Sequence, residues 1–420
     1  MSDSAAGHRR VEGVAPGRLD VLGGVADYSG SLVLQMPLSC VTRVVIEERG
    51  EPGLTFSSEH EPPVALPLPP QDLVAAVRTD AALLRQWLDE HAVPRWVRYP
   101  LGCLAVFAAH WNWRPTGGLA FGITSGVPAS MGVSSSAALE VATLRALERW
   151  AGVSFEGTAL ARLGQRAEND VVAAPCGLMD QLASAHGRPG ELLPILCRPD
   201  VLMESVRLPS RVIAVGWPSG VRHAVADSPY ATARTAAFMG KAILQRALGR
   251  RLPHLAEARP AELCSVGRDV LPDSMTGAEF MARHAAIDDP QSQIEPGRTY
   301  PVRAAAAFAV EEHARAESLE CVLREAPGDD REIVLSMIGE ALAESHAGYS
   351  AMGLGCPETD AMVEAIEDLG PARGFYGARI SGGGSGGTVV VVLNERAIPA
   401  LKALAENMTA SRTDGVRILR

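Results

Sequence analysis

The stretch "GVPASMGVSSSAALE", residues 126–140, leads from small, flexible residues straight into a helical pattern. From Ser136, "SAALEVATLRALERWAG" has apolar residues at helical spacing, three serines in front as capping candidates, and Gly152 as a stop signal. Small side chains let backbone N–H groups approach an anion, and the N-terminus of the helix adds partial positive charge. The segment therefore predicts a phosphate-binding turn. A helix N-cap followed by a polar turn is the alternative that it leaves open.

The hydroxyls of Ser134, Ser135 and Ser136 can add a donor to a phosphate or a ligand to Mg²⁺. The segment lacks the Gly-Lys-Ser/Thr ending of the Walker loop, so it is not that motif.

A second glycine-rich segment lies near the C-terminus. "ARISGGGSGGTVVVV", residues 378–392, places five glycines in six positions directly before an apolar strand expected over 388–393. So many glycines indicate backbone that lies flat against a ligand or another chain segment, and a structural turn is the alternative.

A third segment, "APGRLDVLGGVADYSG", residues 15–30, gathers glycines around Arg18. Two carboxylates follow later in the chain, Glu168 on a helix predicted over about 158–172, and Asp180 after "AAPCG", where Pro175 and Gly177 force a loop. Most aspartates are solvated surface charges, so only the surrounding pattern can assign Asp180 a role.

The other expected elements are a strand over 43–49 and helices over 231–248, 304–314 and 332–347. The proline-rich piece "EPPVALPLPP", residues 61–70, is expected to be a surface loop.

The composition limits the classes of function. A chain of 420 residues with 47% hydrophobic and 21% charged residues is long enough for two domains. The net charge of −10 comes without a basic block, so nucleic acid is not an expected partner. The sequence has no secretory signal and no apolar run of about 18 residues, so we expect a cytoplasmic protein without a membrane span. Its seven cysteines include no C-x-x-C pair, which favours reduced thiols.

Taken in order, these segments resemble those of the GHMP kinase superfamily, named for galactokinase, homoserine kinase, mevalonate kinase and phosphomevalonate kinase. The galactokinase branch fits best. Its opening pattern PGRVNLIGEHTDYNGG is matched by residues 16–30, its middle motif by "GVSSSAALE", its C-G-x-M-D-Q by residues 176–181 and its TGGGFGG by residues 381–387. The stretch "VRHAVADSPY", residues 221–230, resembles one that ends in a sugar-pocket tyrosine. The runs "APGRLD", "ADYSGSLVLQMP" and "APCG" most resemble the kinase part of the plant L-arabinokinases.

The resemblance implies an α+β fold of two domains, an N-terminal ATP-binding GHMP kinase domain over 1–182 and a C-terminal GHMP kinase domain over 183–420, with the active site in the cleft between them. It also implies ATP and Mg²⁺ as cofactors. The expected state is a monomer or weak homo-oligomer.

The resemblance assigns roles to individual residues. Asp180 is expected to face the anomeric hydroxyl of a sugar, as general base or as electrostatic anchor, and Arg18 to lie between Asp180 and the transferred phosphoryl group. An adjacent guanidinium keeps an aspartate ionised and stabilises charge on phosphoryl oxygens. Mg²⁺ is expected at Ser136 and Glu168. The expected sugar-binding residues are Gly24, Val25, Asp27, Cys176, Gly177, Tyr230, Gly383 and Gly384. The expected ATP-binding residues are Trp96, Ser130, Gly132, Ser134, Ser135 and Ser136. Core packing is an equal alternative for Trp96, and Ser130 stands where the family usually has a glycine.

A departure from the family pattern implies the substrate. Galactokinases carry Glu-His where this chain has Gly24 and Val25, and that pair reaches the C6 side of galactose. L-Arabinopyranose has the ring hydroxyls of D-galactopyranose without that carbon. The resemblance therefore implies a kinase that makes L-arabinose 1-phosphate. D-Galactose is the alternative substrate, and a non-catalytic regulator that binds sugar and ATP is the alternative function.

Overall fold

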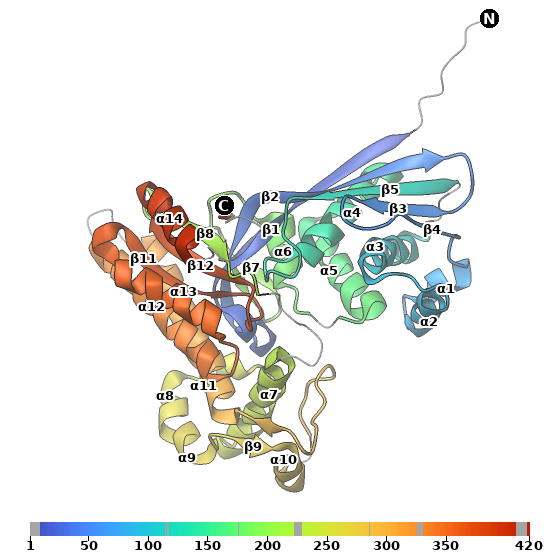
Figure 1. The fold of residues 1–420 in the computed structure, drawn as a ribbon. Coiled ribbons are helices and arrows are strands. Elements are labelled where there is room, and N and C mark those ends of the chain that lie inside the picture. Colours follow the sequence, from blue (N-terminus) through green and yellow to red (C-terminus); the bar gives the residue numbers. More distant parts are fainter. Residues whose placement is uncertain are drawn as a thin grey trace, which may run out of the picture. The chain divides into compact units, whose positions relative to one another are not determined.

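The computed structural model describes residues 9–113, 115, 117–174, 176–221, 229–284, 286–325, 331–408 and 418–420 (Figure 1). Pro175 and residues 222–228 of the segment that precedes Tyr230 lie outside the described residues. The chain packs as two units. Unit 1 holds the described residues up to Gly17, Ser39–Pro128 and Ser134–His186, and unit 2 holds Arg18–Leu38, Ala129–Val133 and the described residues from Gly187 onward. The predicted domain boundary at residue 182 divides the chain once. It therefore does not separate the segments 18–38 and 129–133, which precede residue 182 but pack with unit 2.

Unit 1 combines a sheet with helices. Its strands follow the order β4-β3-β5-β2, where β2 runs antiparallel to β5 and β3 runs parallel to β5. The helix predicted from Ser136 is confirmed as α4, and it packs against α3, α5 and α6. The helix predicted over 158–172 is confirmed as α5, which continues into one π-helical stretch. The elements are β1 Arg10–Leu22, β2 Leu32–Arg49, β3 Leu54–Ser58, β4 Val64–Leu66, α1 Gln71–Ala76, α2 Ala82–Glu90, α3 Arg95–Trp111, β5 Gly118–Ser125, α4 Ser135–Ala151, α5 Gly157–Arg166, η2 Ala167–Val172 and α6 Met179–His186, of which β1 and β2 continue into unit 2.

The proline-rich piece 61–70 differs from the expected loop because it contains the short strand β4. Val64–Leu66 pairs antiparallel with β3 at the edge of the sheet, where Leu66 lies opposite Leu54. Prolines stand on both sides of these three residues. Proline cannot donate to a strand ladder, so the flanking prolines limit the strand to three residues.

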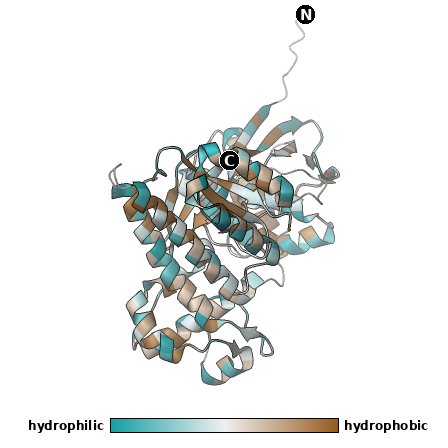
Figure 2. Cartoon of the chain, turned by 60° about the vertical axis from the view of Figure 1, so that its left-hand side comes forward, coloured by the Kyte–Doolittle hydropathy of each residue, from teal (hydrophilic) through white to brown (hydrophobic). Residues whose placement is uncertain are grey.

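Unit 2 is built on a three-stranded antiparallel sheet in the order β11-β12-β8. The apolar strand predicted over 388–393 is confirmed as β12, whose side chains from Val389 to Leu393 are inaccessible to solvent. Helices α12 and α13 pack against β11, and α11 packs against α7 and α12. Figure 2 shows hydrophobic strand residues behind helices whose outer faces are hydrophilic.

The helices predicted over 231–248 and 332–347 are confirmed as α7 and α12, and the one predicted over 304–314 as α11, which continues to Glu325 through a polar segment. The elements are η1 Gly24–Ser29, β6 Leu193–Leu196, β7 Val201–Leu202, β8 Val212–Pro218, α7 Pro229–Ala247, η3 Leu255–Glu257, α8 Pro260–Glu262, η4 Leu263–Gly267, α9 Arg268–Val270, β9 Met275–Thr276, α10 Gly277–Arg283, β10 Thr299–Tyr300, α11 Val302–Glu325, α12 Arg331–Ala351, α13 Pro357–Leu369, η6 Pro371–Arg373, β11 Phe375–Ser381, β12 Thr388–Asn394, η7 Glu395–Ala397 and α14 Ile398–Met408.

All seven cysteines are free thiols, as their spacing predicts. Among the helices that the structure describes, none is both long enough and apolar enough to cross a membrane.

The packing of β1 onto α4 in unit 1 gives a stability prediction. A Cβ atom at Gly13 would lie 1.9 Å from Ala142 O and 2.5 Å from Ala146 N, so Gly13→Ala forces strand and helix apart. We expect the free energy of unfolding to fall by about 1–3 kcal/mol, the usual cost of overpacking. Gly50→Ala is the matched control, because a Cβ there has no atom within 4 Å. Chemical unfolding measures both variants, and equal midpoints would contradict the close packing at Gly13.

Candidate active site

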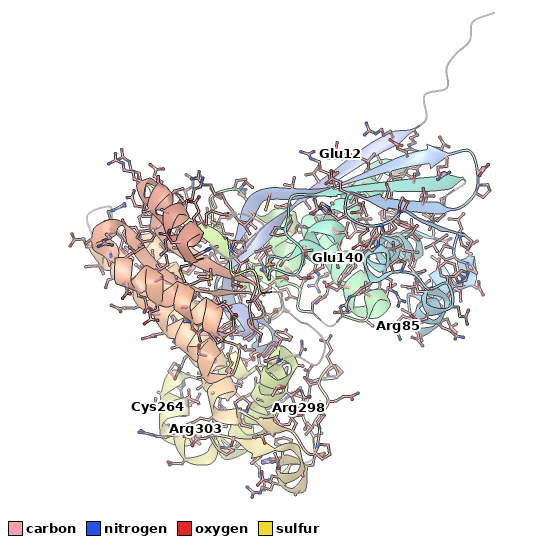
Figure 3. The ribbon with its side chains drawn as sticks, in the orientation of Figure 1. Glu12, Arg85, Glu140, Cys264, Arg298 and Arg303 are labelled. Carbon is pink, nitrogen blue, oxygen red and sulfur yellow. The ribbon has the colours of Figure 1, made fainter. Side chains whose placement is uncertain are left out.

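A cluster of carboxylates lies among α4, η2 and α6 of unit 1. The Gln181 amide donates from Nε2 to Glu140 Oε2 and to Glu168 Oε2, each at 2.9 Å. Figure 3 labels Glu140, which is fully buried on α4. Burial, and then the neighbouring charge of Glu168, raises the pKa of Glu140 well above its usual value. Burial also raises the pKa of Glu168, and the charge of Asp180 acts in the same direction. The cluster therefore concentrates negative charge in a place where water does not screen it.

Several residues that the sequence singles out meet at Glu168. The side chains of Ser136 and Cys176 lie beside its carboxylate, and both act to lower its pKa against the effect of burial. Asn169 Oδ1 accepts a hydrogen bond of 2.8 Å from Cys176 N, which fixes the loop that leads to α6. Gly177 is half-buried in the same loop, and Asp180 is half-buried in the first turn of α6. Unit 1 thus brings together Ser136, Glu168, Cys176 and Asp180.

The N-terminus of α4 lacks the side-chain cap that serines can supply. Ser134 occupies the N-cap position with φ 56° and ψ 48°, in the left-handed region, and makes no capping hydrogen bond. Its hydroxyl is buried and has no hydrogen-bond partner among the residues that the structure describes. The N-cap alternative therefore does not account for Ser134, and Ser135 and Ser136 follow it half-buried on the helix.

In unit 2, Arg18 contacts the first half of the 126–140 segment. Its Nη1 donates to Gly132 O at 2.7 Å, and its backbone N–H donates to Val133 O at 3.1 Å. Ser130, which replaces a family glycine, has φ 59°, the left-handed conformation that glycine adopts without strain. The local backbone thus keeps the glycine conformation in spite of the substitution.

The C-terminal glycine-rich segment lies against the same backbone. A Cβ at Gly382 would be 2.7 Å from Gly132 O, and one at Gly387 would be 3.1 Å from Met131 O. Thr388 Oγ1 donates to Met131 O at 2.7 Å. Of the two interpretations that the glycines left open, close approach to another chain segment applies at these positions. Gly384 also has a positive φ, 77°, and Gly383 lies between it and Gly382.

The turn that carries Gly24 and Val25 is held from inside unit 2. The amide of Gly23 donates to Glu312 Oε1 at 2.9 Å, that of Gly24 to Asp20 Oδ1 at 3.1 Å, and that of Val25 to Tyr349 Oη at 3.0 Å. Three consecutive amides thus have buried side-chain acceptors. The Val25 side chain is 2% exposed and belongs to the apolar core of unit 2.

Asp20 forms a buried ion pair beneath this turn. Its Oδ2 lies 3.2 Å from Arg379 Nη1, and both residues are inaccessible to solvent. Gln35 Nε2 donates to Asp20 Oδ1 at 2.7 Å, and Gly382 N donates to Oδ2 at 3.3 Å. The pair therefore connects the opening segment to the C-terminal glycine-rich segment.

Asp27 and Tyr230 lie on either side of Tyr28. Tyr28 and Tyr230 meet edge to face with centroids 6.1 Å apart, and Asp27 Oδ1 accepts a hydrogen bond of 2.7 Å from Tyr28 N. Burial, followed by the charges of Tyr230 and Asp27, raises the pKa of Tyr28 well above its usual value. The Arg234 guanidinium lies 5.3 Å from the Tyr28 ring centroid and is held by Asp289 at 2.8 Å. Two predicted sugar residues therefore share one cluster.

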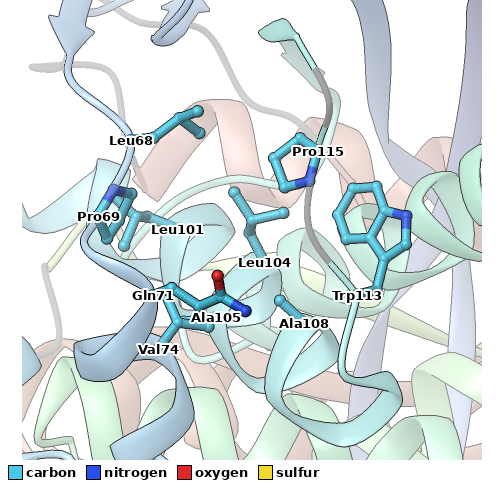
Figure 4. A pocket seen from close by; sticks show the side chains of 10 residues that line it. All are labelled: Leu68, Pro69, Gln71, Val74, Leu101, Leu104, Ala105, Ala108, Trp113 and Pro115. Atoms are coloured by element: carbon cyan, nitrogen blue, oxygen red, sulfur yellow. The ribbon is translucent and has the colours of Figure 1, made fainter.

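An apolar pocket lies elsewhere in unit 1 (Figure 4). Leu101, Leu104, Ala105 and Ala108 of α3 form one wall, and Gln71 contributes a polar group. None of the predicted site residues is among the ten that line it. Trp96 is half-buried against the core of unit 1, which agrees with its packing interpretation and leaves its nucleotide role a prediction.

The sequence motifs assign no role to the buried residues that hold the turn at residues 23–25 and the carboxylate cluster in place. They are Asp20, Glu140, Glu312, Tyr349 and Arg379. Asp20 carried a signal, since it is a carboxylate within the apolar strand that begins the opening motif. Arg379 likewise stands alone before an apolar strand, whereas Tyr349 lies on a helix with no motif around it.

The fold is that of solved sugar and mevalonate kinases. The crystal structure of Lactococcus lactis galactokinase complexed with galactose matches 98% of this chain and 92% of its own with a TM-score of 0.72, at 19% identity. The crystal structure of L. major mevalonate kinase in complex with R-mevalonate matches with a TM-score of 0.59 over 100% of this chain and 98% of its own, at 14% identity.

Sequence comparison gives the same family. The model of the GHMP kinases N terminal domain matches residues 98–188, and that of the GHMP kinases C terminal domain matches residues 331–410. Galactokinase of Bos taurus is 32% identical over 92% of this chain and 84% of its own length. L-Arabinokinase of Arabidopsis thaliana is 32% identical over 90% of this chain, which spans only 42% of that longer protein. The chain belongs to the GHMP kinase family.

Proposed function

We propose that this chain is an ATP-dependent sugar 1-kinase that converts L-arabinose to L-arabinose 1-phosphate. The observation that carries the proposal is the turn at Gly24 and Val25, which presents no polar side chain where galactokinases carry Glu-His. The similarity to an L-arabinokinase and to galactokinases, at 32% identity each, supports a sugar as the acceptor.

The N-terminus of α4 is proposed to bind the triphosphate. Its amides are not capped by a side chain, and the Ser134 hydroxyl is buried without a partner among the described residues. A helix N-terminus attracts anions through its free N–H groups and its dipole. A phosphate oxygen would satisfy the hydroxyl that the protein leaves unsatisfied. Ser135, Gly132 and Ser130 belong to the same proposed nucleotide site, together with Trp96.

The oxygen groups at Glu168 fit a magnesium ion. One carboxylate and the Ser136 hydroxyl supply hard oxygen ligands, and a cation would stabilise the ionised form of Glu168, whose pKa is raised first by burial and then by the charge of Asp180. Within the described residues, no group of three or more His, Cys, Asp or Glu side chains is arranged to hold a metal. That agrees with Mg²⁺ that takes few protein ligands and shares substrate phosphates and water. Bound there, the ion would neutralise charge on the phosphates.

Asp180 and Arg18 are proposed as the catalytic residues. The anomeric oxygen forms a bond to the γ-phosphorus, the bond to the bridging oxygen of ADP breaks, and the hydroxyl proton passes to the Asp180 carboxylate. Arg18 stabilises negative charge on the transferred group. Asp27, Tyr230, Cys176 and Gly177 are proposed to orient the sugar, with Gly383 and Gly384 leaving room for it.

A sugar panel tests the function. We expect kcat/KM for L-arabinose to exceed that for D-galactose by about 10- to 200-fold under identical Mg²⁺-ATP conditions, the range that one missing group in a pocket gives. ADP release measures turnover, and phosphorus NMR identifies the 1-phosphate. A higher value for D-galactose contradicts the arabinose assignment, and binding without sugar-dependent turnover indicates a regulator.

Replacing Asp180 tests the chemical step. Asp180→Asn keeps the shape and removes the proton acceptor, so kcat should fall by about 10²- to 10⁴-fold while the KM for ATP changes little. Asp72→Asn on the exposed face of α1 is the matched control. A kcat within threefold of the unmodified protein rules out the assignment.

Removing the Ser134 hydroxyl tests the nucleotide site. Ser134→Ala should raise the KM for ATP about tenfold, the value of a hydrogen bond to a charged group. Its unfolding temperature should stay the same or rise, because a buried, unsatisfied hydroxyl is removed. Ser265→Ala, on an exposed surface, should change neither quantity. An unchanged KM with a lower unfolding temperature would show instead that the hydroxyl only stabilises the fold.

A further inference from the structure

The turn at Gly24 excludes a side chain because another residue already fills the space. Gly24 has φ 51°, and a Cβ built on it would lie 1.9 Å from Tyr349 Oη and 2.9 Å from Tyr349 Cζ. The same Cβ would lie 2.8 Å from Arg379 Nη2. Non-bonded heavy atoms settle at about 3.5–4.0 Å, so residue 24 can carry a side chain only if Tyr349 moves together with the Arg379 guanidinium that lies over its ring.

Tyr349 is held where it stands. Its side chain on α12 is inaccessible to solvent, and its ring meets Phe308 edge to face with centroids 5.4 Å apart. The Arg379 guanidinium lies 4.9 Å from the ring centroid on its face. Because the ring is packed on its face and at its edge, it cannot withdraw from Gly24 without disturbing the core.

The Tyr349 hydroxyl also connects two loops that are assigned to the sugar side. It accepts a hydrogen bond of 3.0 Å from Val25 N and donates one of 2.7 Å to Gly382 O. A Cβ at Gly384 would lie 3.2 Å from Tyr349 Cδ1, so the ring also supports the C-terminal glycine-rich segment. One side chain outside both motifs therefore fixes the backbone of both.

We propose that Tyr349 is a specificity-determining residue, whose hydroxyl takes the place of a side chain at residue 24 and so keeps that wall of the sugar pocket free of a side chain from residue 24. The inference rests on the proposed function in placing this turn beside the sugar. Tyrosine at 349 and any residue other than glycine at 24 exclude each other. A change of sugar preference through residue 24 therefore requires a smaller residue at 349.

A double-variant cycle tests this coupling. Gly24→Ala should lower kcat/KM for the preferred sugar by about 10- to 200-fold, and Gly24→Ala combined with Tyr349→Leu should recover at least about tenfold of that loss. Gly24→Glu combined with Tyr349→Leu should shift the ratio of kcat/KM for D-galactose over L-arabinose about tenfold toward galactose, whereas Gly24→Glu alone should not. Gly249→Ala is the matched control, because Gly249 has φ 64° and nothing lies within 4 Å of its Cβ.

Each outcome of this cycle either supports or contradicts the proposal. If Gly24→Ala behaves like Gly249→Ala, or if the effects of the two substitutions simply add, the proposal is wrong. If Gly24→Ala fails to fold while the double variant folds, the exclusion is supported. If both fail to fold, Tyr349→Phe decides, since it keeps the ring: a KM for the sugar at least about fivefold higher, with an unchanged KM for ATP, supports the role, and an unchanged sugar KM overturns it.

Failure of the proposed function would be seen separately. A wild-type protein that phosphorylates neither sugar contradicts the kinase assignment but leaves the coupling measurable as unfolding temperature. Gly24→Ala should then unfold at a lower temperature than Gly249→Ala, and Tyr349→Leu should remove that difference. A lasting difference in the presence of Tyr349→Leu would overturn the coupling whatever the substrate is.

Discussion

The buried pair of Asp20 and Arg379 is the interaction on which the predicted sugar side of unit 2 depends. Removing two charges from water costs more than their attraction returns unless hydrogen bonds satisfy the remaining oxygens. Here the Asp20 carboxylate also accepts from Gln35 and from the amides of Gly24 and Gly382. An apolar pair of the same size would fill the space, but it would leave both amides without partners. The pair is thus retained for the backbone that it positions, and it joins residues 359 positions apart in the sequence.

Unit 1 treats its charges in the opposite way. Burial and the charge of neighbouring carboxylates raise the pKa of Glu140 and of Glu168, and the group that bridges these two, Gln181, is neutral. Unit 2 pairs its buried Asp20 with Arg379, whereas in unit 1 the neutral amide of Gln181 bridges Glu140 and Glu168. Buried carboxylates that lie close together attract a cation or a proton.

The sequence predicted the helices and strands that a local pattern of residues specifies. The helix at 136–152 and the strand at 388–393 were found because periodicity and flanking residues specify them. The family resemblance groups the segments that carry Arg18, Gly132 and Gly382. Only the fold shows which atoms meet, because both Arg18 and Gly382 lie against the carbonyl of Gly132. Tyr349 could not have been found, because nothing around it on α12 distinguishes it from a core residue. Its importance arises only from the turn that the chain places against it, 324 residues away.

The position of Tyr349 bears on how sugar preference is encoded in this chain. The departure at residues 24 and 25 first reads as a loss of polar contacts, yet Val25 is buried in the apolar core and three amides of the turn are tied inward. The turn is therefore a rigid wall of backbone. It differs from a galactokinase turn by more than the loss of two side chains. A rigid wall selects by shape, and its shape follows from Tyr349, Asp20 and Glu312. Similar identity to an L-arabinokinase and to galactokinases does not separate the two sugars. In our proposal the deciding contact is one hydroxyl outside the shared motifs.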